Sequence, residues 1–256
     1  MFTDFIMITT KEYINLITES FFQQITTKWI ENAYNDLDQF IKSYQENYIE
    51  IRKNELISLG KNNLEAFNSA RQSWRPIVWD VLVQLVWIAV QKIAEKHWIK
   101  ITNDKLIKST KNLSKELSLV RNNILIHYNE YSFLPDWDLI LYTYNSDSEK
   151  VDVLCIISFK TSFRERFTET PYWKLKLLQN PVTEWIKVVM VTTDNDDEIW
   201  CISSSQGPRK ARVVMEYELD AIFIANERFE STDKVSSIKD LFLYLSNLFS
   251  DRWQKE

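Results

Sequence analysis

Apolar residues in the first part of the chain recur every three or four positions, which is the spacing of an amphipathic helix. The pattern runs from about Lys11 to Gly60 and resumes from about Asn63 to His97. Gly60 suits a helix C-cap because glycine adopts positive φ without strain. Pro76 suits the start of the most apolar stretch of the second block. We therefore expect a helical N-terminal region with a core stripe of aromatic side chains.

After about Asn122 the pattern changes to short apolar runs bounded by polar turns, which is typical of strands. These runs lie at 124–127, 139–144, 151–159, 186–192 and 219–225. The second and third flank the polar turn 145–150 and predict an antiparallel hairpin. Helices are expected from near Phe163 to Pro181 and over about 237–249. This succession predicts an α/β fold, with helices packed on a sheet.

The composition excludes several familiar chemistries. The 256 residues include only two glycines, two histidines and two cysteines. Phosphate-binding glycine loops need several glycines close together, and zinc sites need paired His or Cys ligands. Carboxylate, amine, guanidinium and aromatic groups remain. The chain has no recognisable secretion signal and no apolar run that is long and unbroken enough to span a bilayer, so we expect a cytoplasmic protein without a membrane segment.

The residues that carry chemistry lie around the predicted hairpin. Asp136 and Asp138 precede its first strand, and Lys160 ends its second strand. Antiparallel pairing brings the start of one strand beside the end of the next, so these groups should converge at one edge of the sheet. A carboxylate that holds a hard divalent cation beside an ammonium group can support phosphodiester hydrolysis. Two solvated aspartates and a surface lysine are the alternative interpretation.

A run of alternating charge follows the lysine. Arg164, Glu165 and Arg166 are expected in the first turn of the next helix, where two cations oppose the helix dipole. Arginine can bind guanine O6 and N7, and glutamate can accept from cytosine N4, so the run suits recognition of G·C pairs. The segment 158–176 holds five basic and two acidic side chains, against a net charge of −5 for the chain. This charge predicts a locally basic cleft for nucleic acid.

At these residues the sequence resembles the PD-(D/E)XK type II restriction endonucleases, and within them the CCGG/CCNGG-recognising group (BsaWI/EcoRII-like). In that group the E-x-K element becomes S-x-K, a form that Ser158-Phe159-Lys160 has, and an R-(D/E)-R triplet begins four residues after the lysine. The resemblance implies a mixed sheet flanked by helices. It also implies a Mg²⁺-dependent enzyme of a restriction-modification system that cuts double-stranded DNA at a CC/GG site and leaves 5′-phosphate ends.

The resemblance also implies roles for individual residues. Lys160 would be the catalytic lysine, Ser158 would stand at the substituted acid, and Asp138 rather than Asp136 would be the main metal ligand. The second acid of the group falls here on Trp173, so Glu169, one helical turn earlier, is the substitute candidate. An acid from an N-terminal helix, used by some members, would correspond to Asp80.

The remaining expectations concern DNA contacts and assembly. Arg164, Glu165 and Arg166 would recognise G·C pairs. Arg209, Lys210 or Arg212, in a predicted polar loop over 203–212, would bind phosphate or flanking bases. Cutting both strands of a palindrome implies a homodimer, with higher association left open. We expect a helical region over 1–100 for dimerisation and DNA contact and a catalytic core over 101–256, in one integrated domain. A repair or structure-selective nuclease on the same core and a non-catalytic DNA-binding module are the alternative hypotheses.

Overall fold

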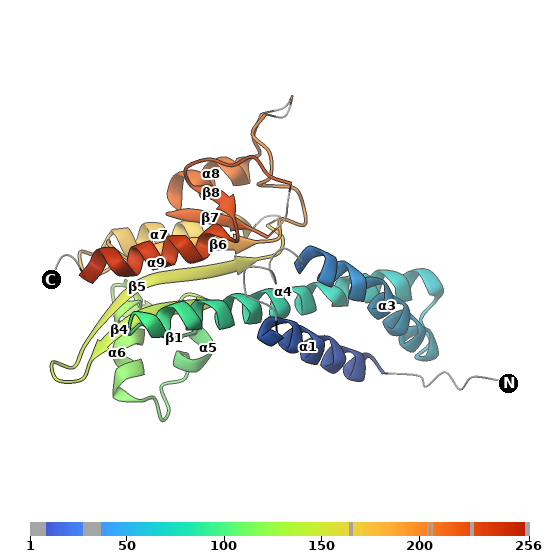
Figure 1. The fold of residues 1–256 in the computed structure, drawn as a ribbon, viewed down its shortest axis with the longest axis horizontal. Coiled ribbons are helices and arrows are strands. Elements are labelled where there is room, and N and C mark those ends of the chain that lie inside the picture. Colours follow the sequence, from blue (N-terminus) through green and yellow to red (C-terminus); the bar gives the residue numbers. More distant parts are fainter. Residues whose placement is uncertain are drawn as a thin grey trace. The chain divides into compact units, whose positions relative to one another are not determined.

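The computed structural model describes residues 9–27, 37–163, 166–203, 205, 207–225 and 228–253. The chain divides into two compact units, 1–85 and 86–256, with the division inside a long helix. The N-terminal unit is helical, as the spacing predicted. It contains α1 (Thr10–Thr27), α3 (Leu37–Ser58) and the first part of α4 (Asn63–Lys96), shown in blue to cyan in Figure 1.

Two local features decide how these helices end and continue. Gly60 has a φ of 94°, and Lys61 N donates to the Leu56 carbonyl oxygen, so Gly60 is the predicted C-cap. Pro76, expected at the start of the most apolar stretch of the second block, lies inside α4. Within the described residues α4 alone is long and apolar enough to cross a bilayer, a criterion that buried helices of soluble proteins also meet. The absence of a membrane segment therefore stays a prediction.

A mixed sheet forms the centre of the C-terminal unit. Its order is β1-β4-β5-β6-β7-β8. The pairs β1–β4 and β4–β5 are antiparallel, and the three pairs from β5 to β8 are parallel. The strands are β1 (Lys100–Thr102), β4 (Leu139–Asn145), β5 (Lys150–Lys160), β6 (Lys187–Thr192), β7 (Ala221–Ile224) and β8 (Val235–Ser237). The predicted mixed sheet is thus present, and the β4–β5 hairpin is confirmed.

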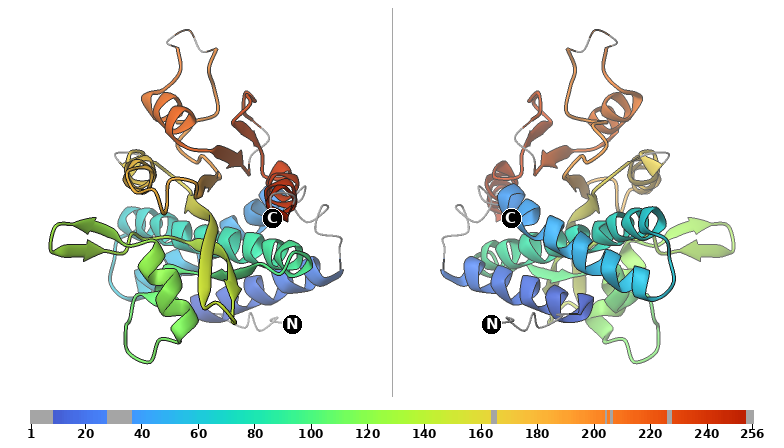
Figure 2. Two further views of the ribbon diagram at one scale, coloured as in Figure 1. Left: turned by 90° about the vertical axis from the view of Figure 1, so that its left-hand side faces the viewer. Right: turned by 90° about the vertical axis from the view of Figure 1, so that its right-hand side faces the viewer.

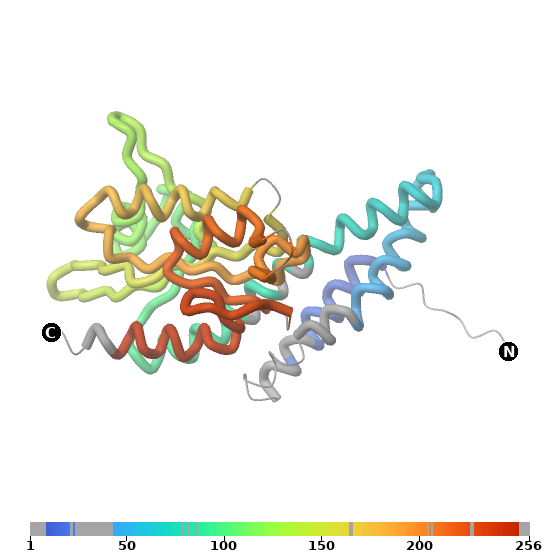
Figure 3. Tube along the Cα trace, turned by 90° about the horizontal axis from the view of Figure 1, so that it is seen from above, coloured from blue at the N-terminus to red at the C-terminus, as the bar shows by residue number. Residues whose placement is uncertain are grey.

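Helices flank both faces of this sheet. They are α5 (Asp104–Ile107), α6 (Lys115–Asn123), α7 (Glu169–Leu178), α8 (Lys210–Glu218) and α9 (Asp240–Trp253). Side chains of α6, α7 and α8 share one buried cluster with Ile156 and Met190 of the sheet. The opposite face meets α9, where the rings of Phe223 and Tyr244 lie 5.5 Å apart. Figures 2 and 3 show α7 (yellow to orange) and α9 (red) on opposite sides of the strands.

Several predicted boundaries were wrong. The run 124–127 enters a strand only at its end, in β2 (Ile126–Tyr128), which pairs with β3 (Tyr131–Phe133) in a small hairpin that extends from the sheet in Figure 2. The helix expected from Phe163 begins only at Glu169, because Phe163 is buried in the core and its backbone N–H donates to the Asp196 carboxylate. The loop expected over 203–212 ends in α8, which begins at Lys210.

Candidate active site

The start of β4 and the end of β5 bring the predicted catalytic residues together. Asp138 directly precedes β4, and Leu139 is paired with Ile157 of β5. The Oδ2 atom of Asp138 accepts a hydrogen bond from Phe159 N at 2.7 Å, so this carboxylate is fixed to the residue before Lys160. The convergence of Asp138 and Lys160 that the hairpin predicted is confirmed.

The carboxyl group of Asp138 is strongly perturbed. Burial raises its pKa to about 6, although the Phe159 N–H and the Lys160 ammonium both oppose that rise. The negative charges of Asp104 and Asp136 add to the increase. Burial makes the ionised form of this carboxylate costly, and a bound cation would stabilise that form. Groups with strongly shifted pKa values concentrate at functional sites. Asp138 is therefore the best placed of the predicted acids for binding a divalent ion.

Glu169 links the lysine to an arginine of the triplet. Its Oε2 atom lies 3.1 Å from Lys160 Nζ and 2.8 Å from Arg166 Nη2. Burial alone would raise the pKa of Glu169, but the charges and hydrogen bonds of Lys160 and Arg166 outweigh it and lower that pKa. Glu169 is thus ionised at neutral pH and holds both cations at the first residue of α7. Glu169 was the substitute candidate for the second acid; the structure brings it beside Lys160, and its role as a metal ligand stays a prediction.

Ser158 lies one alternation before Lys160 on the same face of β5. Its side chain is buried, and its Oγ atom lies 3.1 Å from Thr170 Oγ1. Thr170 follows Glu169 in α7. The serine at the position of the usual acid therefore fixes β5 against the start of α7, while the negative charge beside Lys160 comes from Glu169.

One acidic residue near this edge of the sheet, Asp104, was not predicted from the sequence. Asp104 begins α5, two residues after the end of β1, and its backbone N donates to the Trp137 carbonyl oxygen at 3.0 Å. Burial raises the pKa of Asp104, and the charge of Asp136 raises it further. The signal was Asn103-Asp104 at a helix start, where Asn103 caps the backbone of Leu106. It was missed because the three-residue strand β1, which leads the chain to this edge, was not predicted.

The other two predicted metal ligands, Asp136 and Asp80, are more exposed than Asp138. Asp136 is 70% exposed at its side chain and pairs with Lys108 at 3.6 Å. Asp80 lies exposed on α4 in the N-terminal unit. Across the described part of the chain, no three His, Cys, Asp or Glu side chains are grouped closely enough to hold a metal ion. Mg²⁺ commonly takes one or two protein carboxylates and completes its coordination shell with water and phosphate. In number and type of ligand, Asp138 and Glu169 fit such a site.

Arg166 was expected in the first turn of a helix but precedes α7, which begins at Glu169, so that expectation is wrong for Arg166. Arg166 is 69% exposed at its side chain even while it pairs with Glu169. Arg164 and Glu165 lie outside the described residues.

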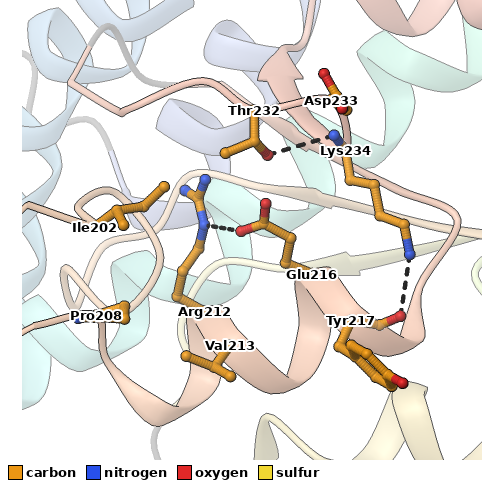
Figure 4. A pocket seen from close by; sticks show the side chains of 9 residues that line it. All are labelled: Ile202, Pro208, Arg212, Val213, Glu216, Tyr217, Thr232, Asp233 and Lys234. Carbon is orange, nitrogen blue, oxygen red and sulfur yellow. Dashed lines mark hydrogen bonds and ion pairs between the residues drawn. The ribbon is translucent and has the colours of Figure 1, made fainter.

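Arg212 has a structural position rather than an exposed one. It is only 1% exposed, and it donates to Glu216 Oε2 and to the carbonyl oxygens of Ile199 and Glu230 at 2.6–2.9 Å. Figure 4 shows its guanidinium beside Glu216 on the wall of a cavity of about 660 Å³. The expectation that Arg212 contacts DNA is therefore wrong, because its donors hold the interior together. Arg209 and Lys210, at the start of α8, are exposed.

Comparisons with known proteins show the family of the chain. Residues 107–244 match the family model described as BsaWI restriction endonuclease type 2. A Methanocaldococcus jannaschii protein described as type II restriction enzyme MjaVIP is 39% identical over 78% of this chain and 87% of its own length. A Helicobacter pylori protein described as type II restriction enzyme HpyAORF263P is 43% identical over 65% of this chain and 83% of its own.

A solved structure resembles the fold. The PspGI restriction endonuclease, in complex with substrate DNA, aligns with a TM-score of 0.55 over 95% of this chain and 94% of its own. The identity is 12%, so this likeness concerns the fold alone.

Proposed function

Because the chain belongs to the BsaWI family of type II restriction endonucleases, we propose that it is a Mg²⁺-dependent enzyme that cuts double-stranded DNA at a site containing CC and GG. The observation that supports this proposal best is the strand-edge cluster, which we define as Asp138, Lys160, Glu169 and Arg166. In it, Glu169 accepts hydrogen bonds from the Lys160 ammonium group and the Arg166 guanidinium, and Asp138, whose pKa is raised, accepts from the backbone N–H of Phe159, the residue before Lys160. The cluster supplies groups for metal binding, hydrolysis and base recognition at one edge of the sheet.

The proposed chemistry is hydrolysis of one phosphodiester bond in each strand. A water oxygen forms a bond to phosphorus, and the bond from phosphorus to O3′ breaks, leaving a 5′-phosphate and a 3′-hydroxyl. Asp138, with Glu169 as second ligand, would hold Mg²⁺, which when bound lowers the pKa of a coordinated water and offsets phosphate charge. Lys160 donates hydrogen bonds to the attacking water or to a phosphate oxygen, and Glu169 keeps its ammonium group oriented.

Recognition would come from the segment just after the lysine. Arg164 and Arg166 each present a fork that fits guanine O6 and N7, and Glu165 can accept from cytosine N4. Arg209 and Lys210 would bind the DNA backbone. Since a palindromic site presents the same contacts twice, we propose a homodimer acting in the cytoplasm, with the helical region contributing to dimerisation.

A pair of variants on one strand tests this assignment. Lys160 ends β5 and Lys150 begins it, so Lys160→Ala and Lys150→Ala remove the same charge from the same strand at opposite ends. In digests of plasmid DNA with Mg²⁺, Lys160→Ala should lose cleavage while retaining site-specific binding in gel shifts. Lys150→Ala should cut like the wild type. Wild-type cleavage by Lys160→Ala would show that the active site has been placed wrongly.

A further inference from the structure

Two chain segments meet just beyond the carboxyl ends of β5 and β6. These strands are parallel, with Lys160 paired to Thr192, so both leave the sheet at the same edge. The segment that follows β5 runs through Thr161 and Phe163 to the arginine triplet. The segment that follows β6 is the acidic loop, defined here as residues 194–198. Asn195 N donates to the Thr161 carbonyl oxygen at 3.0 Å, which joins the two segments directly.

The acidic side chains of this loop have separate tasks. Asp194 is buried, and its carboxylate accepts from the backbone N–H groups of Glu198, Ile199 and Trp200 at 2.8–3.0 Å. It therefore closes the loop upon itself. Asp196 instead reaches across to the other segment, where its Oδ2 atom accepts from Phe163 N at 2.8 Å. Asp197 is exposed. The acidic loop is therefore closed by Asp194 and bound to the segment after β5 by Asp196.

The side chain, the backbone N–H and the carbonyl oxygen of Phe163 all make contacts that fix this residue. Its side chain is 1% exposed within the core, its N–H is bound by Asp196, and its carbonyl oxygen accepts from Arg166 N at 2.7 Å. A hydrogen bond to an ionised carboxylate is about twice as strong as one between neutral groups. Asp196, in the loop after β6, therefore holds the backbone of Phe163, and Phe163 in turn holds the backbone N–H of Arg166.

We propose that Asp196 is a positioning residue for sequence recognition, setting the path of the chain into the Arg164-Glu165-Arg166 triplet. This inference rests on the proposed function of the triplet. An arginine that makes paired contacts to a guanine must be placed within about 0.5 Å and 10–20° of the productive geometry. This geometry is lost when the backbone before the arginine moves. Asp196 acts through the backbone N–H of Phe163, in the segment that leads into the triplet. Its effect should therefore fall on discrimination between sites more than on the rate at the correct site.

The test compares four variants with the wild type. Asp196→Ala removes the acceptor, Asp196→Asn keeps an acceptor oxygen at the same distance, and Asp196→Glu keeps the charge but displaces it by one methylene. Asp197→Asn removes the same charge one residue later and is the matched control. For each, single-turnover cleavage with Mg²⁺ is measured on the duplex carrying the wild-type site and on duplexes with one C·G pair replaced. Thermal unfolding is recorded alongside.

Discrimination is the ratio of the cleavage rate on the wild-type site to the rate on a substituted duplex, and for the wild type this ratio should be large. Asp196→Ala should reduce the ratio at least about fivefold, which is the lower end of what one paired arginine contact gives. Asp196→Asn should restore most of it, Asp196→Glu should not, and Asp197→Asn should match the wild type. If Asp196→Ala does not fold, the contrast between Asp196→Asn and Asp196→Glu decides. Unchanged discrimination in Asp196→Ala, or an equal fall in rate on all duplexes, would overturn the inference. A wild type that cuts without sequence preference would instead overturn the proposed function.

Discussion

The buried carboxyl group of Asp138 should destabilise the metal-free protein at neutral and alkaline pH. Its pKa is about 6, whereas an exposed aspartate has 3.8. Because the folded-state pKa is raised, the favourable contribution is complete below about pH 4 and is lost as pH rises through about 6. At 1.36 kcal/mol for each pH unit of difference, ionised Asp138 costs the fold about 3 kcal/mol at pH 8. Asp138→Asn removes this cost and keeps an oxygen that can accept from Phe159 N.

Chemical denaturation in EDTA at pH 4.5 and at pH 8 measures this effect. Asp138→Asn should be more stable than the wild type by up to about 3 kcal/mol at pH 8 and by much less at pH 4.5, while cleavage with Mg²⁺ is lost. Asp147→Asn, in the exposed turn of the β4–β5 hairpin, is the control and should show no such gain. A gain that is absent at pH 8, or equal at both pH values, would refute the argument that burial perturbs Asp138.

Three further variants separate catalysis, folding and DNA contact. Glu169→Gln weakens the hold on two cations, and single-turnover cleavage should fall about 10- to 150-fold, as for a lost charged hydrogen bond; an unchanged rate would remove Glu169 from the site. Arg212→Met should cost about 3–5 kcal/mol in urea unfolding because it leaves Glu216 partly buried without its partner, and stability equal to the wild type would contradict the buried geometry. Arg209→Ala should leave stability unchanged and lower the salt slope of DNA binding by about 1; an unaltered slope would show no phosphate contact.

The parts of the fold that were predicted correctly carry strong local signals. Strands β4, β5 and β6 are runs of apolar residues buried on both faces, and the polar turn between β4 and β5 specifies a hairpin. The site prediction depended on that hairpin, since pairing alone brings Asp138 beside Phe159 and Lys160. Register and alternation were therefore enough to place the acid and the lysine.

The missed parts depend on contacts that sequence spacing does not reveal. Strands β1 and β8 have three residues each, too few for a period, and with β1 the position of Asp104 was lost. Arg212 looked like a DNA contact because basic residues cluster around it, whereas burial against two carbonyl oxygens and Glu216 decides its role. The start of α7 was displaced because Asp196, distant in sequence, binds the backbone of Phe163.

Sequence-specific cleavage is tested most directly by digesting plasmid DNA with the purified protein and sequencing the fragment ends. With Mg²⁺ the account predicts fragments that all end at one sequence containing CC and GG, with 5′-phosphates, and no cleavage in EDTA. Ends spread over unrelated sequences would contradict site recognition, and the absence of cleavage with Mg²⁺ would contradict the proposed catalytic role of the strand-edge cluster.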